Sequence, residues 1–231
     1  MLQDKYKIYI LSYDSKTEDT AIKQFSNKSW STVININTTI YLENIMYDTW
    51  LLNHQDQWIN HDYVGTLSWR SYTKIQLPKL DNQININLIK DKNPDIVAFA
   101  PTTMNLLYQA TRDHGQRFRK IWIYLIKNLG YSVEEAIDPT VKLFFCNYWM
   151  AKPPVMIDYI NFFEKAKYIL ENSEEIQNDL WSNSNYNGYV SSGRLTEIFG
   201  RPYYPYHPFI FERLPCFFFH QKYNILPYQE K

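Results

Sequence analysis

The sequence predicts a single α/β domain in which a mixed sheet is flanked by helices and carries an irregular C-terminal third. Two observations predict this class. Apolar, β-rich runs alternate with helical patterns along much of the chain, and the last third is rich in prolines and aromatic residues. At 231 residues the chain suits one large domain, and it shows no internal repeat or clear boundary. We therefore expect one domain over residues 1–231.

The N-terminal part of the chain is predicted to alternate strands and helices. Short apolar runs rich in Ile, Val and Tyr predict strands at 7–13, 31–36, 62–69 and 95–100. Helices are expected at 17–25 and at 40–59, where apolar residues recur close to helical spacing. Residues 79–94 are polar and Asn-rich, which indicates a loop with at most a short edge strand.

The remaining part of the chain mixes helical patterns with segments that exclude regular structure. Helices are predicted at 117–129, at 153–171 and over a last stretch that includes 212–219. Gly130 suits the end of the first of these helices, and Pro153 suits the first turn of the second. The run 142–150 is apolar but is interrupted by Asn147. A loop is expected at 183–187, and the prolines of 201–209 predict a stiff segment that is not a regular helix.

Composition excludes several classes of function. Lys and Arg number 24, as do Asp and Glu, so the chain lacks the basic excess of a non-specific nucleic-acid binder. Cys146 and Cys216 lie in aromatic runs and are expected to be buried free thiols. No apolar run approaches the roughly 20 residues that span a bilayer, and residues 1–7 lack a signal-peptide core. We expect a soluble, cytoplasmic protein without a membrane span.

Common catalytic signatures are missing from the sequence. It contains only six glycines and no GxGxxG, Walker A or GxSxG pattern, so ordinary dinucleotide, phosphate-loop and α/β-hydrolase functions lose their main support. No Cys/His spacing suggests zinc. His54 and His61 lie near Asp56 and Asp62, but this grouping is more simply a solvated helix end. No residue is therefore assigned as a metal ligand.

The segment 62–70 carries the first candidate site. It reads as an apolar strand that stops at Ser68, Trp69 and Arg70. In an open α/β sheet, ligands bind beyond the carboxyl ends of strands, so this strand end predicts the opening of a ligand-binding site. The guanidinium of Arg70 could hold a diphosphate through two hydrogen bonds, or it could pair with a nearby carboxylate. The sequence leaves both alternatives open.

Two further polar residues interrupt apolar runs. A buried amide at Asn147 would need hydrogen-bond partners, which a structural turn or a ligand could supply. Glu212 lies in an almost wholly apolar segment, where it would be a general base in a pocket or half of an ion pair with Arg213 or Arg194. Taken alone, the residues favour the ion pair.

Residues 108–117 concentrate polar and cationic groups before a helix, and His114 is the candidate substrate contact among them. Backbone N–H groups of this predicted loop could face an anion at the helix N-terminus. A solvated start of the helix is the simpler alternative.

Taken in order, these segments resemble a family of GT-A type glycosyltransferases found in bacterial capsule gene clusters and in large DNA viruses. Residues 41–50, Tyr-Leu-Glu-Asn-Ile-Met-Tyr-Asp-Thr-Trp, lead into 62–70, where the family has a Tyr/Gly strand. Residues 145–152, Phe-Cys-Asn-Tyr-Trp-Met-Ala-Lys, resemble its Asn-x-x-x-Met-Lys strand, and 209–214 are similar to its Glu-Arg-Leu segment. The abundance of Asn, Ile, Lys and Tyr fits an AT-rich genome, which is compatible with a viral protein.

The resemblance implies a nucleotide-diphospho-sugar transferase fold and a donor site. A nucleotide-sugar would be the co-substrate, with Ser12, Tyr13 and Asp14 near its nucleobase and ribose. Arg70 would lie near the diphosphate, and Arg213 would support the site or the phosphates.

The resemblance also implies an acceptor site and a mechanism. Asn147 would help to hold the acceptor sugar, with Trp69 and His114 as further substrate contacts. Glu212 would be the general base for a single displacement that inverts the anomeric carbon. The activity would be hexosyl or pentosyl transfer to a glycan acceptor, in glycan biosynthesis.

One departure from the family concerns the metal. No Asp-x-Asp occurs in the chain, and the expected position reads Leu-Ser-Trp-Arg, which leaves the use of Mn²⁺ or Mg²⁺ open. The missing motif and the aromatic excess also support an alternative function, a non-catalytic carbohydrate-binding or assembly module. A nucleotide-binding hydrolase is a third, weaker alternative.

Overall fold

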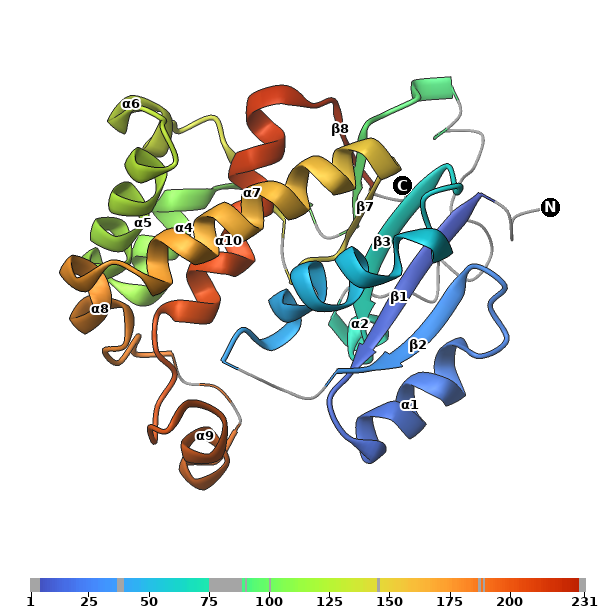
Figure 1. Cartoon of the computed structure of the whole chain (residues 1–231), viewed down its shortest axis with the longest axis horizontal. Coiled ribbons are helices and arrows are strands. Elements are labelled where there is room, and N and C mark those ends of the chain that lie inside the picture. Colours follow the sequence, from blue (N-terminus) through green and yellow to red (C-terminus); the bar gives the residue numbers. More distant parts are fainter. Residues whose placement is uncertain are drawn as a thin grey trace.

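A computed structural model describes most of the chain (Figure 1). The described residues are 5–36, 40–74, 89, 91–99, 101–144, 146–186, 188 and 190–228. The loop predicted at 79–94 lies largely outside them, as do Ala100 and Asn187 at the ends of two other predicted segments.

A mixed six-stranded sheet forms one part of the molecule. Its order is β2-β1-β3-β7-β4-β8, and every neighbouring pair is parallel except the two that involve β7. The strands are β1 (Tyr6–Ser12), β2 (Ser31–Asn35), β3 (Tyr63–Ser68), β4 (Ile96–Ala98), β7 (Trp149–Ala151) and β8 (Ile225–Pro227). The prediction of a mixed sheet flanked by helices is therefore confirmed, although β8 was not expected.

Both faces of β1 are buried, which explains its unbroken apolar sequence. Successive side chains of a strand point to opposite faces. Ile8 and Ile10 face helix α1 (Ser15–Phe25), whereas Tyr9 and Leu11 face the core that includes Met46. At roughly 25 cal/mol per Å² of apolar surface removed from water, this double burial favours folding strongly and fixes the register of β1.

The chain connections create a crevice at one end of the sheet. Helix α1 links β1 to β2 across one face, and the helical turns η2 to η4 lead from the other face into β3 (Figure 1). Since β2 and β3 lie on opposite sides of β1, helix α1 carries the chain from the carboxyl end of β1 toward β2 and away from β3. Such a switch point is where open α/β sheets bind ligands.

The run predicted as one helix at 40–59 is instead a series of irregular turns. They are η2 (Leu42–Ile45) and η4 (Leu52–Gln57), which are 3₁₀ turns, and η3 (Met46–Leu51), which is a π turn. The wider π turn lets Met46 and Leu51, five residues apart, enter the same core. Core packing has therefore overridden the regular helix that the spacing of the apolar residues at 40–59 predicted.

A second layer of structure is helical and lies beside the sheet (Figure 1). It contains a small antiparallel pair, β5 (Pro101–Asn105) and β6 (Lys142–Phe144). Its helices are α4 (Leu106–His114), α5 (Gln116–Asn128), α6 (Val133–Ala136), α7 (Pro153–Glu171), α8 (Glu174–Leu180), α9 (Ser192–Phe199) and α10 (His207–Lys222). The helices predicted at 117–129 and 153–171 are confirmed. Gly130 has a φ of 98° and follows the C-cap of α5, as expected.

The prediction of an irregular C-terminal third was wrong. Among the described residues, helices α7, α8, α9 and α10 occupy most of it. Helix α10 confirms the last helix predicted to include 212–219, but it begins at His207, within the segment 201–209 that was expected to exclude helix. Pro208 is tolerated because it stands in the first turn, where its missing N–H has no helical partner. Helix α10 is apolar on nearly all sides and buried, so its sequence shows no amphipathic stripe.

Close approach of β3 and β7 requires a glycine at position 65. Gly65 is paired with Met150, and a Cβ placed on it would lie 2.4 Å from the Met150 Cβ and 2.5 Å from the Trp149 carbonyl oxygen. We predict that Gly65→Ala lowers the free energy of unfolding by about 1–3 kcal/mol, the usual cost of overpacking. Urea denaturation measures this change in the free energy of unfolding. The control Gly193→Ala meets no neighbouring atom within 4 Å and should cost nothing; equal stability of both variants would contradict this pairing.

Candidate functional site

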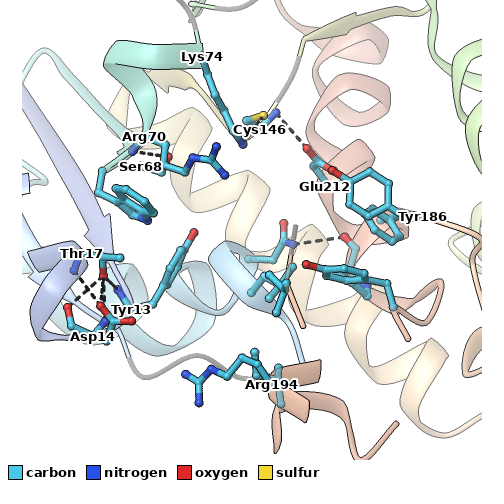
Figure 2. A pocket seen from close by; sticks show the side chains of 18 residues that line it. Tyr13, Asp14, Thr17, Ser68, Arg70, Lys74, Cys146, Tyr186, Arg194 and Glu212 are labelled. Atoms are coloured by element: carbon cyan, nitrogen blue, oxygen red, sulfur yellow. Dashed lines mark hydrogen bonds between the residues drawn. The ribbon is translucent and has the colours of Figure 1, made fainter. Parts of the chain in front are cut away.

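A pocket of about 390 Å³ lies at the carboxyl ends of β1 and β3 (Figure 2). One wall comes from the residues that follow these strands, among them Asp14 and Arg70, and the opposite wall comes from α10, which contributes Glu212. The volume is in the range of small-molecule sites. Five predicted site residues line this pocket: Tyr13, Asp14, Trp69, Arg70 and Glu212.

The β1 side of the pocket is fixed by the start of α1. Asp14 caps the helix: its carboxylate accepts a hydrogen bond from the Thr17 N–H at 2.8 Å and another from the Thr17 hydroxyl. These hydrogen bonds lower the pKa of Asp14, so the group is charged at neutral pH. Ser12 is buried, and its hydroxyl donates to the Ile34 carbonyl at 3.1 Å. Ser12 therefore supports this wall but does not line the pocket.

The β3 side carries two cations. Ser68 is buried at the strand end, and its hydroxyl accepts the Arg70 N–H at 3.2 Å. The exposed guanidinium of Arg70 lies 5.6 Å over the Trp69 ring, and no ion pair of Arg70 is found within the described part of the chain. One turn later, in α2 (Ser71–Lys74), the Lys74 Nζ donates to the Cys146 Sγ at 3.4 Å. Figure 2 shows both cationic side chains reaching toward the pocket.

Glu212 faces these cations from α10, and its carboxylate is held on both oxygens. Oε1 accepts the Cys146 N–H at 3.2 Å, and Oε2 pairs with the Arg213 guanidinium at 3.3 Å. The side chain of Glu212 is 25% exposed, so it remains accessible from the pocket. The ion pair that the residues favoured is therefore formed, and the same carboxylate also borders the pocket.

Arg213 does not line the pocket. Its guanidinium is buried, donates to the Phe209 carbonyl and the Gln109 side chain at 3.0 Å each, and lies over the Phe118 ring. The side chain points into the helical layer because consecutive residues of a helix face different directions. The expected contact of Arg213 with a cofactor is therefore not formed in the pocket. Arg213 instead forms an ion pair with Glu212 and so supports the pocket wall.

Asn147 is a structural residue of the turn between β6 and β7. Its Nδ2 donates to the Asn44 Oδ1 at 2.9 Å, and its carbonyl accepts the Thr66 hydroxyl at 2.7 Å. Cys146 and Asn147 both have positive φ, 63° and 56°, which asparagine tolerates better than most residues. Asn147 is buried outside the pocket, whereas its partner Asn44 and its chain neighbour Cys146 line it.

The loop predicted at 108–117 is largely helical. Asn105 caps α4 by accepting the Tyr108 N–H at 2.8 Å, and α4 continues to His114 before Gly115 separates it from α5. His114 is buried and stacked on Phe209, with ring centroids 4.4 Å apart. It lies outside the pocket, so the predicted substrate contact of His114 is not formed there.

Several pocket residues were not predicted from the sequence. Lys74 lies one helical turn after Arg70, which is the one local signal that could have indicated it. Asn44, Tyr186 and Arg194 come from distant parts of the chain; Asn44 lies in the quoted segment 41–50 without a predicted role, no motif marks Tyr186, and Arg194, a candidate partner of Glu212, pairs with Glu197 instead. Only the tertiary fold brings them to the carboxyl ends of the strands.

A metal cluster is not found in the described part of the chain, where no group of three or more His, Cys, Asp or Glu side chains is placed to hold an ion. The His54 ring stacks on Trp50 at 4.0 Å, and its Nδ1 contacts the Trp50 carbonyl. These contacts account for His54 without a metal. Within the same described residues, no helix is both long and apolar enough to cross a membrane.

Comparisons with protein-family models, with curated proteins and with solved structures each give no match for this chain.

Two buried histidines make stability depend on pH. Burial, together with the charge of Arg213, lowers the pKa of His114 to about 4, and burial lowers that of His207 to about 3. From about pH 6.5 downward the unfolded chain binds protons at both positions while the folded chain does not. We predict that the free energy of unfolding, measured by urea titration, falls between about pH 6.5 and 5, approaching roughly 1.4 kcal/mol per pH unit for each histidine.

The control for this prediction is the double variant His114→Gln/His207→Phe. The stability of this variant should change much less over the same window. An unchanged slope in the double variant would show that other groups cause the pH dependence.

Proposed function

We propose that this chain is a glycosyltransferase that transfers a sugar from a nucleotide-sugar to a glycan acceptor. The observation that carries the proposal is the pocket itself: cations follow β3 on one wall, and an accessible, oriented carboxylate stands on the other. A transfer reaction needs both, because negative charge develops on the leaving diphosphate while the acceptor hydroxyl loses a proton.

The donor is proposed to lie along the strand ends. Arg70 and Lys74 are placed to stabilise a diphosphate, since both are cationic and border the pocket. Tyr13 and Asp14 border its β1 side, where an aromatic face and a charged carboxylate suit a nucleobase and ribose hydroxyls. The switch point between β1 and β3 and the mixed sheet support a GT-A type fold, which we propose as the finer classification.

The acceptor hydroxyl is proposed to approach Glu212. The Cys146 N–H and the Arg213 guanidinium orient this carboxylate, which would accept the proton as the acceptor oxygen attacks the anomeric carbon. The bond from that carbon to the diphosphate oxygen breaks in the same step, so the configuration inverts. Arg70 and Lys74 then stabilise the charge left on the diphosphate.

The donor set of the pocket does not fit a divalent cation. Asp14 is engaged as a helix cap, Glu212 is paired with Arg213, and Arg70 occupies the position where the family resemblance expects an Asp-x-Asp motif. We therefore assign the stabilisation of the leaving diphosphate to the cationic side chains, without Mn²⁺ or Mg²⁺. A thermal-shift screen of nucleotide-sugars, each with and without manganese, tests both this assignment and the ligand class.

A non-catalytic carbohydrate-binding module is the second candidate function. The half-exposed Tyr186 beside the pocket favours it, because exposed aromatic rings are platforms for sugars. This candidate requires glycan binding without any nucleotide. Release of nucleoside diphosphate from a nucleotide-sugar would exclude it.

The proposed base can be tested by a single substitution. Glu212→Gln keeps the shape and the hydrogen-bond acceptor of the side chain but removes its basicity, so transfer should fall about 10²- to 10⁴-fold. Donor binding by calorimetry should stay within about twofold, since the donor contacts are on the other wall. The control Glu164→Gln changes an exposed carboxylate of α7 and should leave both unchanged. Full transfer by Glu212→Gln would refute the role of Glu212.

The proposed contact between Arg70 and the diphosphate can also be tested by substitution. Arg70→Met removes a charged hydrogen-bond donor, so a nucleoside diphosphate should bind about ten- to a hundredfold more weakly, whereas the nucleoside alone should bind equally well. Calorimetry with each ligand gives the ratio of the dissociation constants of the variant and the wild type. Arg112→Met, on an exposed arginine outside the pocket, is the control. Equal weakening for nucleoside and diphosphate would place Arg70 away from the phosphates.

A further inference from the structure

A second hollow of about 520 Å³ lies beside the candidate pocket. Tyr186, Val190 and Tyr204 border both cavities, so these three residues form a common edge. The second hollow is formed by the segments around α9, far in the sequence from the strand ends that form the donor wall. A molecule that crosses the common edge would reach from this hollow into the pocket.

The common edge lies next to the proposed base. The Tyr186 ring packs against Phe209 and Tyr204, with ring centroids 4.9 and 5.3 Å apart, and it is still 48% exposed. Phe209 precedes Glu212 by three residues in α10, so both side chains lie on the same side of that helix. Figure 2 shows Tyr186 beside Glu212 at the edge of the pocket.

The lining of the second hollow is polar but uncharged. Among the described residues that border it, the side chains of Asn183, Asn185, Ser192 and Tyr203 provide amides and hydroxyls, and none carries a formal charge. Amides and hydroxyls both donate and accept hydrogen bonds, as sugar hydroxyls require. An anionic ligand would instead call for cations, and Arg70, Lys74 and Arg194 border the first pocket only.

We propose that this hollow is the acceptor subsite and that it binds a neutral oligosaccharide. One sugar lies against the half-exposed face of Tyr186 and presents its hydroxyl to Glu212, and the next sugar lies among Asn183, Asn185 and Tyr203. The aromatic ring covers the apolar C–H face of the sugar while the amides bind its hydroxyls. The assignment as an acceptor subsite rests on the proposed transfer function; the binding of a neutral glycan does not.

Two substitutions test the subsite. Tyr186→Ala removes the ring, and Asn185→Gly removes an amide while keeping the backbone, because Asn185 has a φ of 57° that glycine adopts readily. Tyr186→Phe keeps the ring face. The control Tyr168→Ala removes a tyrosine that is 68% exposed on α7 and borders neither cavity.

The measurements separate the acceptor from the donor. Binding to a panel of neutral and acidic tri- to hexasaccharides gives glycan affinity, and calorimetry with nucleotide-sugars gives donor affinity. Transfer and hydrolysis of the bound donor, with water as acceptor, are then measured for each variant. Tyr186→Ala and Asn185→Gly should each weaken neutral glycan binding, and raise the KM for the acceptor, about tenfold. Donor affinity and hydrolysis should not change. Tyr186→Phe should recover most of the glycan affinity that Tyr186→Ala loses, because it keeps the ring face, and Tyr168→Ala should behave as the wild type.

The outcomes distinguish this inference from the proposed function. If nucleotide-sugars bind but both variants take up glycans as the wild type does, the subsite is refuted and the transferase function stands. If no nucleotide-sugar binds and glycan binding still depends on Tyr186, the transferase function fails and the neutral glycan site stands. A preference for acidic oligosaccharides, or a fall in donor hydrolysis equal to that in transfer, would also overturn the subsite.

Discussion

The ion pair between Arg213 and Glu212 is the interaction on which the candidate site depends. A buried guanidinium is costly to desolvate unless it is hydrogen-bonded, and the Nη1 and Nη2 groups of Arg213 donate to the Phe209 carbonyl, Gln109 and Glu212, whereas its buried Nε finds no partner among the described residues. Since Gln109 belongs to α4 and the other two partners to α10, the same side chain joins two helices. The helical layer can therefore place a carboxylate at the pocket wall without leaving an unpaired charge in the core.

A second constraint comes from the turn at Cys146 and Asn147. Two consecutive residues with positive φ reverse the chain just before β7, the one antiparallel strand among the described members of the large sheet. The turn is held by the Thr66 hydroxyl and by Asn44, and it directs the Cys146 N–H at Glu212. Backbone strain in this turn is thus linked to the orientation of the proposed base, which is a common association at functional sites.

Local sequence patterns were sufficient to predict a helix where interactions within the segment itself determine its bounds. The helices at 117–129 and 153–171 follow from periodicity and from Gly130 and Pro153, which act within a single turn. Patterns failed where packing on several sides decides the structure. The turns η2 to η4 adjust their pitch to fill the core, and α10, which was predicted to include 212–219, begins already at His207 because its sequence is apolar all round and has no stripe that marks its start. Four of the nine predicted site residues lie outside the pocket for the same reason: Ser12, Asn147, His114 and Arg213 are buried by neighbours that the local sequence does not reveal.

The sequence by itself determined the α/β class, the strand ends that carry Asp14 and Arg70, and the isolation of Glu212 in an apolar segment. These are properties of short stretches, and the alternation of apolar and polar residues is enough to indicate them. Only the tertiary structure decided that the two strand ends and α10 border one pocket, and that Arg213 turns away from it. It also decided that Tyr186, on a segment without any motif, lies beside the carboxylate. Distances between residues far apart in sequence depend on how the two layers pack, and no single stretch of sequence encodes that packing.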